Sequence, residues 1–209
     1  MKVFICGLPK AGKSTVVKEL CKRFDKLDMK RRDPEWLNVN AISWVKGTFR
    51  LANENETPDS YGDDYHNFYI NRIKNDPKLI IDNVRATIAA YNFDNVHWLI
   101  DGIFSPKDFC DLFDYNNDIV VFLNRTDGES DAKDYESIGI SVMRDYCFWL
   151  ASADLLPRNR WLEYNFKIPG EHSDMLKEMG SKNTVYIVKS LNKVIDHLAG
   201  VMLSSSSGS

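Results

Sequence analysis

The stretch GLPKAGKS, from Gly7 to Ser14, restricts the fold of this chain more than any other part of its sequence. It follows the apolar run VFIC and leads into STVVKELCKRF, whose apolar residues fall on one face of a helix. The two glycines, the lysine and the hydroxyl have the spacing G-x-x-x-x-G-K-[ST]. Between a strand and a helix, this spacing is typical of a loop that binds phosphate groups at a helix N-terminus.

Each residue type in this loop has a physical task. Gly7 and Gly12 allow backbone conformations that a side chain would obstruct. Lys13 is expected to reach the β- and γ-phosphates of ATP, and the Ser14 hydroxyl is expected to bind Mg²⁺. The whole loop is therefore the expected ATP-binding site, with these residues: Gly7, Leu8, Pro9, Lys10, Ala11, Gly12, Lys13, Ser14 and Thr15.

Composition excludes several classes of protein. No apolar stretch approaches the ~18 residues that a membrane-spanning helix needs. The four cysteines are far apart and form no C-x-x-C pair, which predicts reduced thiols in a cytoplasmic protein and no zinc site. The formal net charge of −3 predicts no general attraction to nucleic acid, although residues 18–32 carry a local excess of positive charge. That segment is either the solvated face of a helix or a binding patch.

Short apolar runs alternate with helical stretches along the chain, which predicts an α/β fold with a parallel sheet. We expect strands at 2–6, 26–30, 96–101, 119–123 and 184–188. We expect helices at 13–24, about 64–75, 77–92, 106–114, 136–151 and 190–203.

Three polar residues follow expected strands. Asp33, Asp101 and Arg125 should converge on the loop, because sites in parallel sheets form at the carboxyl ends of strands. Asp101 ends the run WLID, where a carboxylate typically holds Mg²⁺ through water beside the loop hydroxyl. The alternative is that Asp101 caps the helix that follows.

The run WLIDGIF resembles the nucleoside monophosphate kinase group of phosphate-loop proteins. In adenylate kinases a strand is followed by Asp-Gly-Phe-Pro-Arg, whereas this chain has Asp101-Gly102-Ile103-Phe104-Ser105 and lacks the Pro-Arg. In that family the arginine helps to hold the phosphate of the acceptor. The resemblance implies a three-layer kinase fold with a five-stranded parallel sheet of order 2-3-1-4-5 and helices on both faces.

Asp33, in MKRRD, is similar in position to an aspartate of phosphate-loop kinases that phosphorylate hydroxyls, such as polynucleotide and shikimate kinases. In those kinases the aspartate takes the proton of the acceptor. A neutral hydroxyl must lose a proton as it attacks, whereas a phosphate acceptor need not. The resemblance therefore implies that Asp33 is a general base. The alternative is an exposed aspartate that starts a turn before Pro34.

Arginines are expected to neutralise the charge that phosphoryl transfer builds on the equatorial oxygens. Arg125 ends the fourth expected strand, and Arg144 lies in the helix SIGISVMRDYCFWL. In the monophosphate kinases, the lid and the helix after it supply such arginines. Either residue could instead form a surface salt bridge.

The stretch SVMRDYCFWLASADLLPRNRWLEYNF, together with the loop, resembles the phage 5-hydroxymethyluracil DNA kinases, which are thymidylate-kinase-like. The resemblance implies an ATP-dependent phosphotransferase that modifies the hydroxymethyl group of that base in phage DNA, in the cytoplasm of an infected cell. The alternative is a deoxynucleoside monophosphate kinase. The expected partners are ATP and a nucleotide or DNA acceptor, with no membrane, and the oligomeric state stays open.

The domain organisation expected from this resemblance is one kinase domain over 1–203. It contains an acceptor-side insertion at 31–95 and a lid region at about 124–163, and residues 204–209 form a flexible tail or linker.

A nucleotide switch is the second class of function. VVFLNRTD resembles the Asn-Lys-x-Asp guanine signature, with Arg125 in place of the lysine. Asp59-Ser60-Tyr61-Gly62 matches D-x-x-G, but it follows the polar NENETP, where a switch GTPase has a buried strand.

Overall fold

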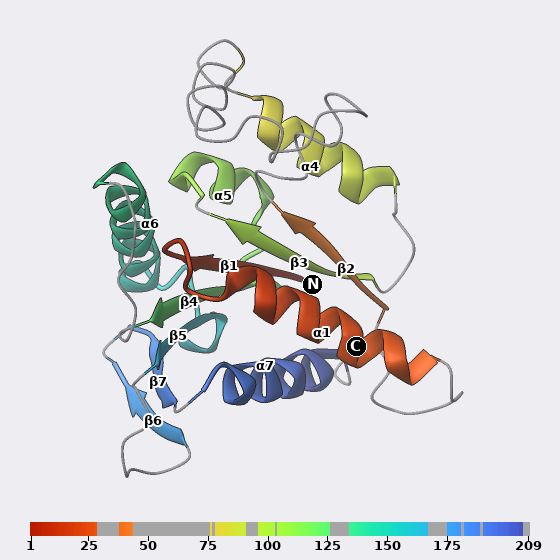
Figure 1. The fold of residues 1–209 in the computed structure, drawn as a ribbon. Coiled ribbons are helices and arrows are strands. Elements are labelled where there is room, and N and C mark those ends of the chain that lie inside the picture. The colour runs from red at the N-terminus through yellow and green to blue at the C-terminus, as the bar shows by residue number, and fades with distance from the viewer. Residues whose placement is uncertain are drawn as a thin grey trace. The chain divides into compact units, whose positions relative to one another are not determined.

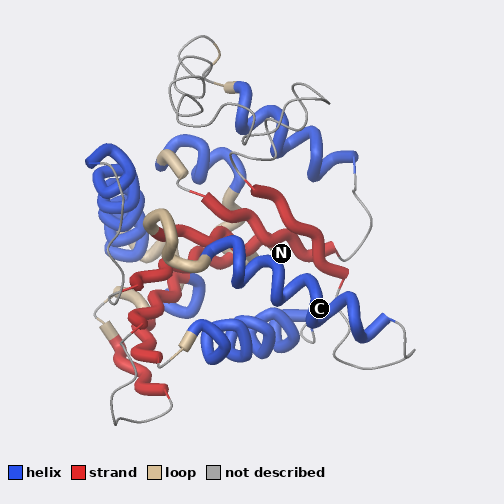
Figure 2. The backbone as a smooth tube through the Cα atoms, in the orientation of Figure 1, coloured by secondary structure: helices blue, strands red, loops and turns tan. Residues whose placement is uncertain are grey.

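In the computed structural model, the strands of the described residues form one seven-stranded sheet (Figures 1 and 2). The strands are β1 (Lys2–Gly7), β2 (Asn38–Ser43), β3 (Val96–Gly102), β4 (Ile119–Arg125), β5 (Trp161–Phe166), β6 (Met175–Met179) and β7 (Thr184–Val188). Their order in the sheet is β2-β3-β1-β4-β5-β7-β6. Strands β3, β1, β4, β5 and β7 run parallel, and β6 pairs antiparallel with β7.

The helices of the described residues are α1 (Lys13–Asp28), α4 (Leu79–Ala90), α5 (Pro106–Leu112), α6 (Asp134–Ser152), α7 (Leu191–Ser206) and the short 3₁₀ helix η3 (Arg158–Arg160). The structure describes residues 1–28, 38–43, 76, 78–90, 96–102, 104–125, 134–166, 175–180, 182–188 and 190–206. Among these residues, no helix is both long and apolar enough to cross a lipid bilayer.

Two compact units make up the chain. The first comprises Met1–Ala41 and Asn95–Ser209, and the second comprises Ile42–Asp94. In the second unit, α4 buries Ile80, Ile81 and Val84, which recur at helical spacing. The expected single domain over 1–203 and its insertion at 31–95 stay predictions.

Helices cover both faces of the sheet in the first unit. On one face, α1 and α7 pack with odd-numbered residues of β1 such as Val3 and Ile5 in one core. On the other face, the Phe4 ring packs against Phe109 of α5, with ring centroids 5.2 Å apart. Because β1 is buried on both faces, it reads as an uninterrupted apolar run. The expected α/β class with helices on both faces is confirmed.

The expected strand at 26–30 is wrong. Helix α1 continues to Asp28, because the stretch after Phe24 contains no glycine or proline to stop it before Pro34. Among the described residues, the strand that follows α1 is β2, so Asp33 precedes this strand in the sequence and does not follow its carboxyl end. Asp33 itself lies outside the described residues.

The expected five-strand sheet is also wrong in number. Strand β5, with the sequence WLEYNF, lies between β4 and β7, which were expected to be neighbours. The other four expected strands and the helices at 13–24, 77–92, 106–114, 136–151 and 190–203 are present with shifted ends. The expected helix at about 64–75 lies outside the described residues.

Phe109→Ala is expected to lower the free energy of unfolding by about 3–5 kcal/mol, because it leaves a cavity in a closed aromatic core. Phe109 is fully buried, whereas Phe148 of α6 is 50% exposed. Phe148→Ala is therefore the control, with an expected loss below about 1 kcal/mol. Urea unfolding followed by circular dichroism measures both. Equal losses in the two variants would contradict the packing of α5 described here.

Candidate active site

The loop between β1 and α1 is held in a conformation that places its glycines where side chains do not fit. Gly12 has a φ of +91°, in the region that favours glycine. A Cβ at Gly12 would also lie 3.0 Å from Leu191 Cδ2, at the start of α7. At Gly7 a Cβ would lie 2.8 Å from the carbonyl oxygen of Leu123 in β4. The two glycines thus let the loop pack closely against β4 and α7.

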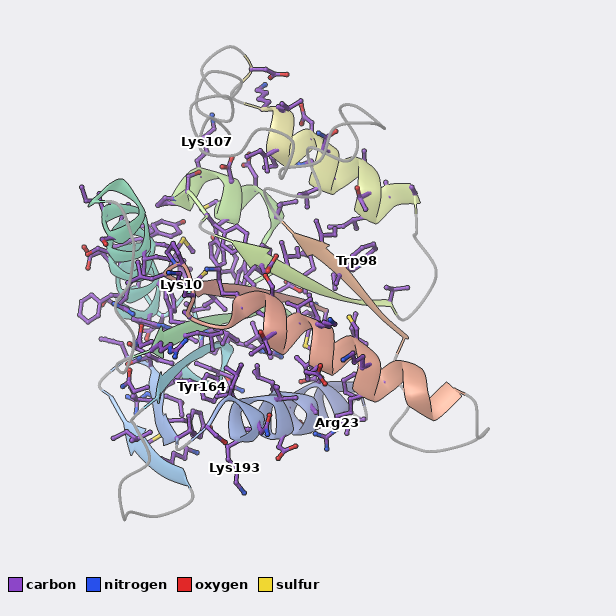
Figure 3. The ribbon with its side chains drawn as sticks, in the orientation of Figure 1. Lys10, Arg23, Trp98, Lys107, Tyr164 and Lys193 are labelled. Atoms are coloured by element: carbon purple, nitrogen blue, oxygen red, sulfur yellow. The ribbon has the colours of Figure 1, made fainter. Side chains whose placement is uncertain are left out.

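The middle of the loop turns outward at Lys10. The Ala11 N–H donates to the Leu8 carbonyl at 3.1 Å, which closes the turn. Lys10, which is labelled in Figure 3, is exposed and has a φ of 63°, an uncommon value for a residue with a side chain. Its carbonyl oxygen accepts a hydrogen bond from Arg125 NH1 at 3.3 Å. Arg125 therefore links the end of β4 to the loop.

Lys13 is at the first position of α1 and folds back over the start of the loop. Its Nζ donates to the carbonyl oxygens of Gly7 at 2.7 Å and Leu8 at 2.9 Å. An ammonium at this position adds positive charge to the helix N-terminus, which already favours an anion. The electrostatics of this end of α1 therefore suit a phosphate group.

Asp101 and Ser14 meet beside the loop. The Ser14 hydroxyl donates to Asp101 Oδ2 at 2.8 Å, and Asp101 is only 6% exposed. The parallel register between β1 and β3 pairs Ile5 with Asp101, so the carboxylate ends its strand next to the start of the loop. In this structure Ser105 caps α5 by accepting from Asp108 N, so Asp101 is not the side chain that caps this helix.

Arg144 lies on the α5 and α6 side of the sheet. Its guanidinium carbon is 5.2 Å from the centroid of the Phe122 ring. Its Nη2 atom donates to Asn124 Oδ1 at 2.6 Å and lies 3.3 Å from Glu163 Oε1. The arginine is thus held by β4 and β5 and is not an isolated surface residue.

Glu163 and three asparagines complete this polar network, and of these the sequence analysis considered only Asn124, in the run that resembles the guanine signature. Asn124 Nδ2 donates to Glu163 Oε1 and to Asn165 Oδ1, and Asn183 Nδ2 donates to Glu163 Oε2 at 2.9 Å. For Glu163, the only signal in the sequence was an acidic residue within the otherwise largely apolar run WLEYNF. The amide of Asn124 is fully engaged, which leaves it no donor for a guanine base and weakens the GTPase alternative.

The thiol behind the loop is neutral. Burial raises the pKa of Cys6 far above its usual range, although the positive charges of Lys13 and Arg144 act in the opposite direction. Because the thiolate is the reactive form, Cys6 is not a nucleophile at this site.

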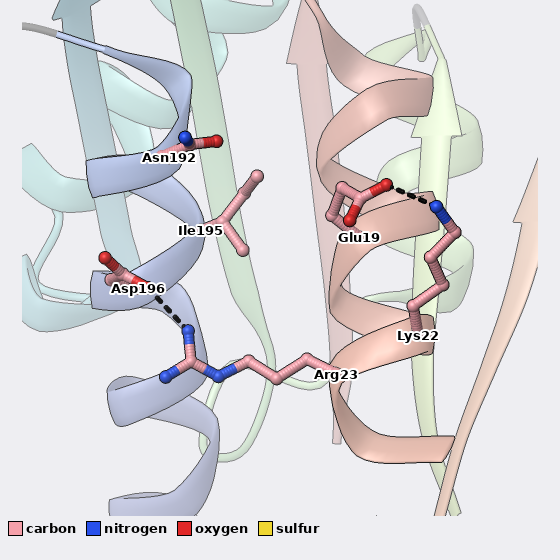
Figure 4. Close-up of a pocket in the computed structure, with 6 residues that line it drawn as sticks. All are labelled: Glu19, Lys22, Arg23, Asn192, Ile195 and Asp196. Carbon is pink, nitrogen blue, oxygen red and sulfur yellow. Dashed lines mark hydrogen bonds and ion pairs between the residues drawn. The ribbon is translucent and has the colours of Figure 1, made fainter. Parts of the chain in front are cut away.

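A pocket between α1 and α7 is separate from these contacts (Figure 4). Six residues line it: Glu19, Lys22, Arg23, Asn192, Ile195 and Asp196. Lys22 pairs with Glu19 at 2.7 Å, and Arg23 pairs with Asp196 at 2.6 Å. These two cations belong to the basic segment 18–32, and their pairing favours its interpretation as a solvated helix face.

No protein-family model matches this sequence, and no curated protein matches it. Among solved structures, the chain is similar to thymidylate kinase from Ehrlichia chaffeensis, with 12% identity and a TM-score of 0.49 over 97% of this chain and 98% of that chain. It is also similar to thymidylate kinase from Candida albicans, with 13% identity and a TM-score of 0.45 over 98% and 92%. Shikimate kinase from Bacteroides thetaiotaomicron has 14% identity and a TM-score of 0.35 over 79% and 86%. At these values the similarities assign no family.

Gly12→Ala is expected to lower the free energy of unfolding by about 1–3 kcal/mol, because an alanine is strained at this φ and meets Leu191. Gly200 of α7 is the matched control, since a Cβ there meets nothing within 4 Å. Gly200→Ala should stabilise the protein by about 0.5–1 kcal/mol. Thermal unfolding of both variants tests this difference, and a stabilised Gly12→Ala variant would contradict the loop conformation.

Proposed function

We propose that this chain is a phosphotransferase that moves the γ-phosphate of ATP to a hydroxyl of a nucleotide or nucleic acid. The observation that carries the proposal is the arrangement at the N-terminus of α1. A glycine-built loop, the Lys13 ammonium and the Ser14–Asp101 pair meet there. These are the groups that phosphoryl transfer requires: a cradle for phosphates, a cation, and oxygen ligands for a metal.

The Ser14–Asp101 pair fits Mg²⁺ in its chemistry. A hydroxyl and a carboxylate oxygen 2.8 Å apart are hard oxygen donors of the kind that Mg²⁺ prefers. Ser14 and Asp101 would hold the ion, which when bound neutralises charge on the phosphates. Lys13 would stabilise the charge that develops on the transferred group, and the loop would orient it.

Arg125 and Arg144 are proposed to contribute further positive charge. Arg125 contacts the loop through the Lys10 carbonyl, and Arg144 donates a hydrogen bond to Asn124, the residue before Arg125 in β4. Both therefore belong to the surroundings of the loop. Both arginines lie within the lid region proposed at about 124–163, and Arg144, which is held by β4 and β5, would contribute its charge from a fixed position.

The proposal also names the group that accepts the phosphate. The hydroxymethyl group of 5-hydroxymethyluracil in phage DNA is favoured by the resemblance of residues 141–166 and by the absence of the arginine that grips an acceptor phosphate in adenylate kinases. A deoxynucleoside monophosphate is the alternative acceptor.

Transfer of labelled γ-phosphate from ATP to free deoxynucleotides, 5′-hydroxyl oligonucleotides and DNA containing hydroxymethyluracil tests the proposal and identifies the acceptor.

Lys13→Ala is expected to lower the rate of labelled phosphate transfer by about 100-fold or more, because a cation that stabilises the transition state is lost. Lys22→Ala, on the exposed face of the same helix, is the control and should stay within about twofold of the unchanged protein. Retention of half the original rate by Lys13→Ala would contradict the proposed role of the loop.

Asp33→Asn separates the two classes of acceptor. If Asp33 is the general base for a hydroxyl, the variant should lose about 10²–10⁴ in kcat and keep its affinity for ATP. If the acceptor is a phosphate, no base is needed and the loss should be small. Steady-state kinetics on each acceptor measures this. Unchanged turnover on the hydroxyl acceptors would favour the monophosphate kinase alternative.

A further inference from the structure

The pairing of Arg144 with Glu163 joins three secondary-structure elements of the first unit. Arg144 comes from α6, Asn124 from β4 and Glu163 from β5. The parallel register sets Phe122 opposite Glu163, so the aromatic ring and the carboxylate are adjacent on one face of the sheet. The guanidinium lies over this ring and beside this carboxylate. The position of Arg144 is therefore determined by the sheet as well as by its own helix.

Glu163 is the fixed member of this pair. Its Oε1 accepts from Asn124 and its Oε2 accepts from Asn183, so both carboxylate oxygens have a donor besides Arg144. Its side chain is 15% exposed, compared with 36% for Arg144. Since an arginine has a long stem and many rotamers, the less exposed carboxylate, which accepts on both oxygens, is what limits where the guanidinium can go.

The network reaches the loop through β4. Asn124 follows Leu123, whose carbonyl oxygen packs against Gly7, and precedes Arg125, which bonds to the Lys10 carbonyl. The Nε atom of Arg144 is buried and has no hydrogen-bond partner. The contacts of Arg144 with Asn124 and Glu163 both involve its Nη2 atom, so neither of them uses the N–H of Nε.

We propose that Glu163 is a positioning residue for phosphotransfer: it orients the Arg144 guanidinium so that this cation can neutralise charge on the transferred phosphate. The inference rests on the proposed function and adds to it a residue that does not touch the phosphates. Asn183 donates to Glu163 Oε2, whereas Arg144 pairs with Oε1, so Asn183 helps to hold the carboxylate in this orientation without contacting the arginine.

The test is steady-state turnover of ATP by the full chain, measured as phosphate release and as transfer to the acceptor. Glu163→Gln keeps the size of the side chain and removes its charge. It is expected to lower kcat by about tenfold with KM for ATP changed by less than about threefold, because misplacing a group costs rate more than binding. Asp196→Asn is the matched control, since it breaks another arginine–carboxylate pair, with Arg23, on α7. It should leave kcat within about twofold.

A double-mutant cycle with Arg144→Gln separates positioning from a structural role. The double variant should be as slow as Arg144→Gln alone, within about twofold, because Glu163 acts only through this arginine. Independent, multiplying losses would overturn the inference, as would an unchanged kcat in Glu163→Gln.

Asn183→Ala provides a second variant if Glu163→Gln does not fold. It leaves both members of the ion pair intact and frees one carboxylate oxygen, so we expect kcat to fall by about threefold. An unchanged kcat would overturn the inference. A protein that neither turns over ATP nor binds a non-hydrolysable ATP analogue would instead refute the proposed function. Normal turnover with an insensitive Glu163 would refute the inference alone.

Discussion

Parallel pairing of β1 with β3 on one side and β4 on the other is the interaction on which the site depends. It brings the carboxyl ends of β1, β3 and β4 side by side at one end of the strands, where the loop leaves β1. Asp101 and Arg125 reach the loop only because their strands end beside it. Burial of β1 on both faces fixes this arrangement, since a shift of one residue would exchange the side chains that face the two helical layers.

The sequence predicted the parts of the fold that are encoded locally. Central strands buried on both faces appear as apolar runs such as IVVFL, and the loop carries its own spacing of glycine, lysine and serine. Strand β5 was missed because Glu163 and Asn165 interrupt its apolar character. Those residues face a polar network instead of an apolar layer, so the usual signal of a core strand is absent.

The network around Arg144 could not be predicted from spacing. Its members come from α6, β4, β5 and the residue before β7, and they meet only through the register of the strands. Asn124 illustrates the difficulty, because in the sequence it resembles a residue that reads guanine. In the structure its amide bonds to Arg144, Glu163 and Asn165. The same side chain therefore has different chemistry once its neighbours are known.

The contact between Gly12 and Leu191 has a consequence for how the protein is made. Leu191 lies 179 positions after Gly12, so the loop leaves the ribosome well before the helix that packs on it. Contacts so distant along the chain form late, because a long stretch must be ordered before they are gained. During synthesis the loop therefore lacks the packing of Leu191 until α7 has emerged. A nascent chain that stops before residue 191 would have the complete phosphate-loop sequence without the packing that supports it.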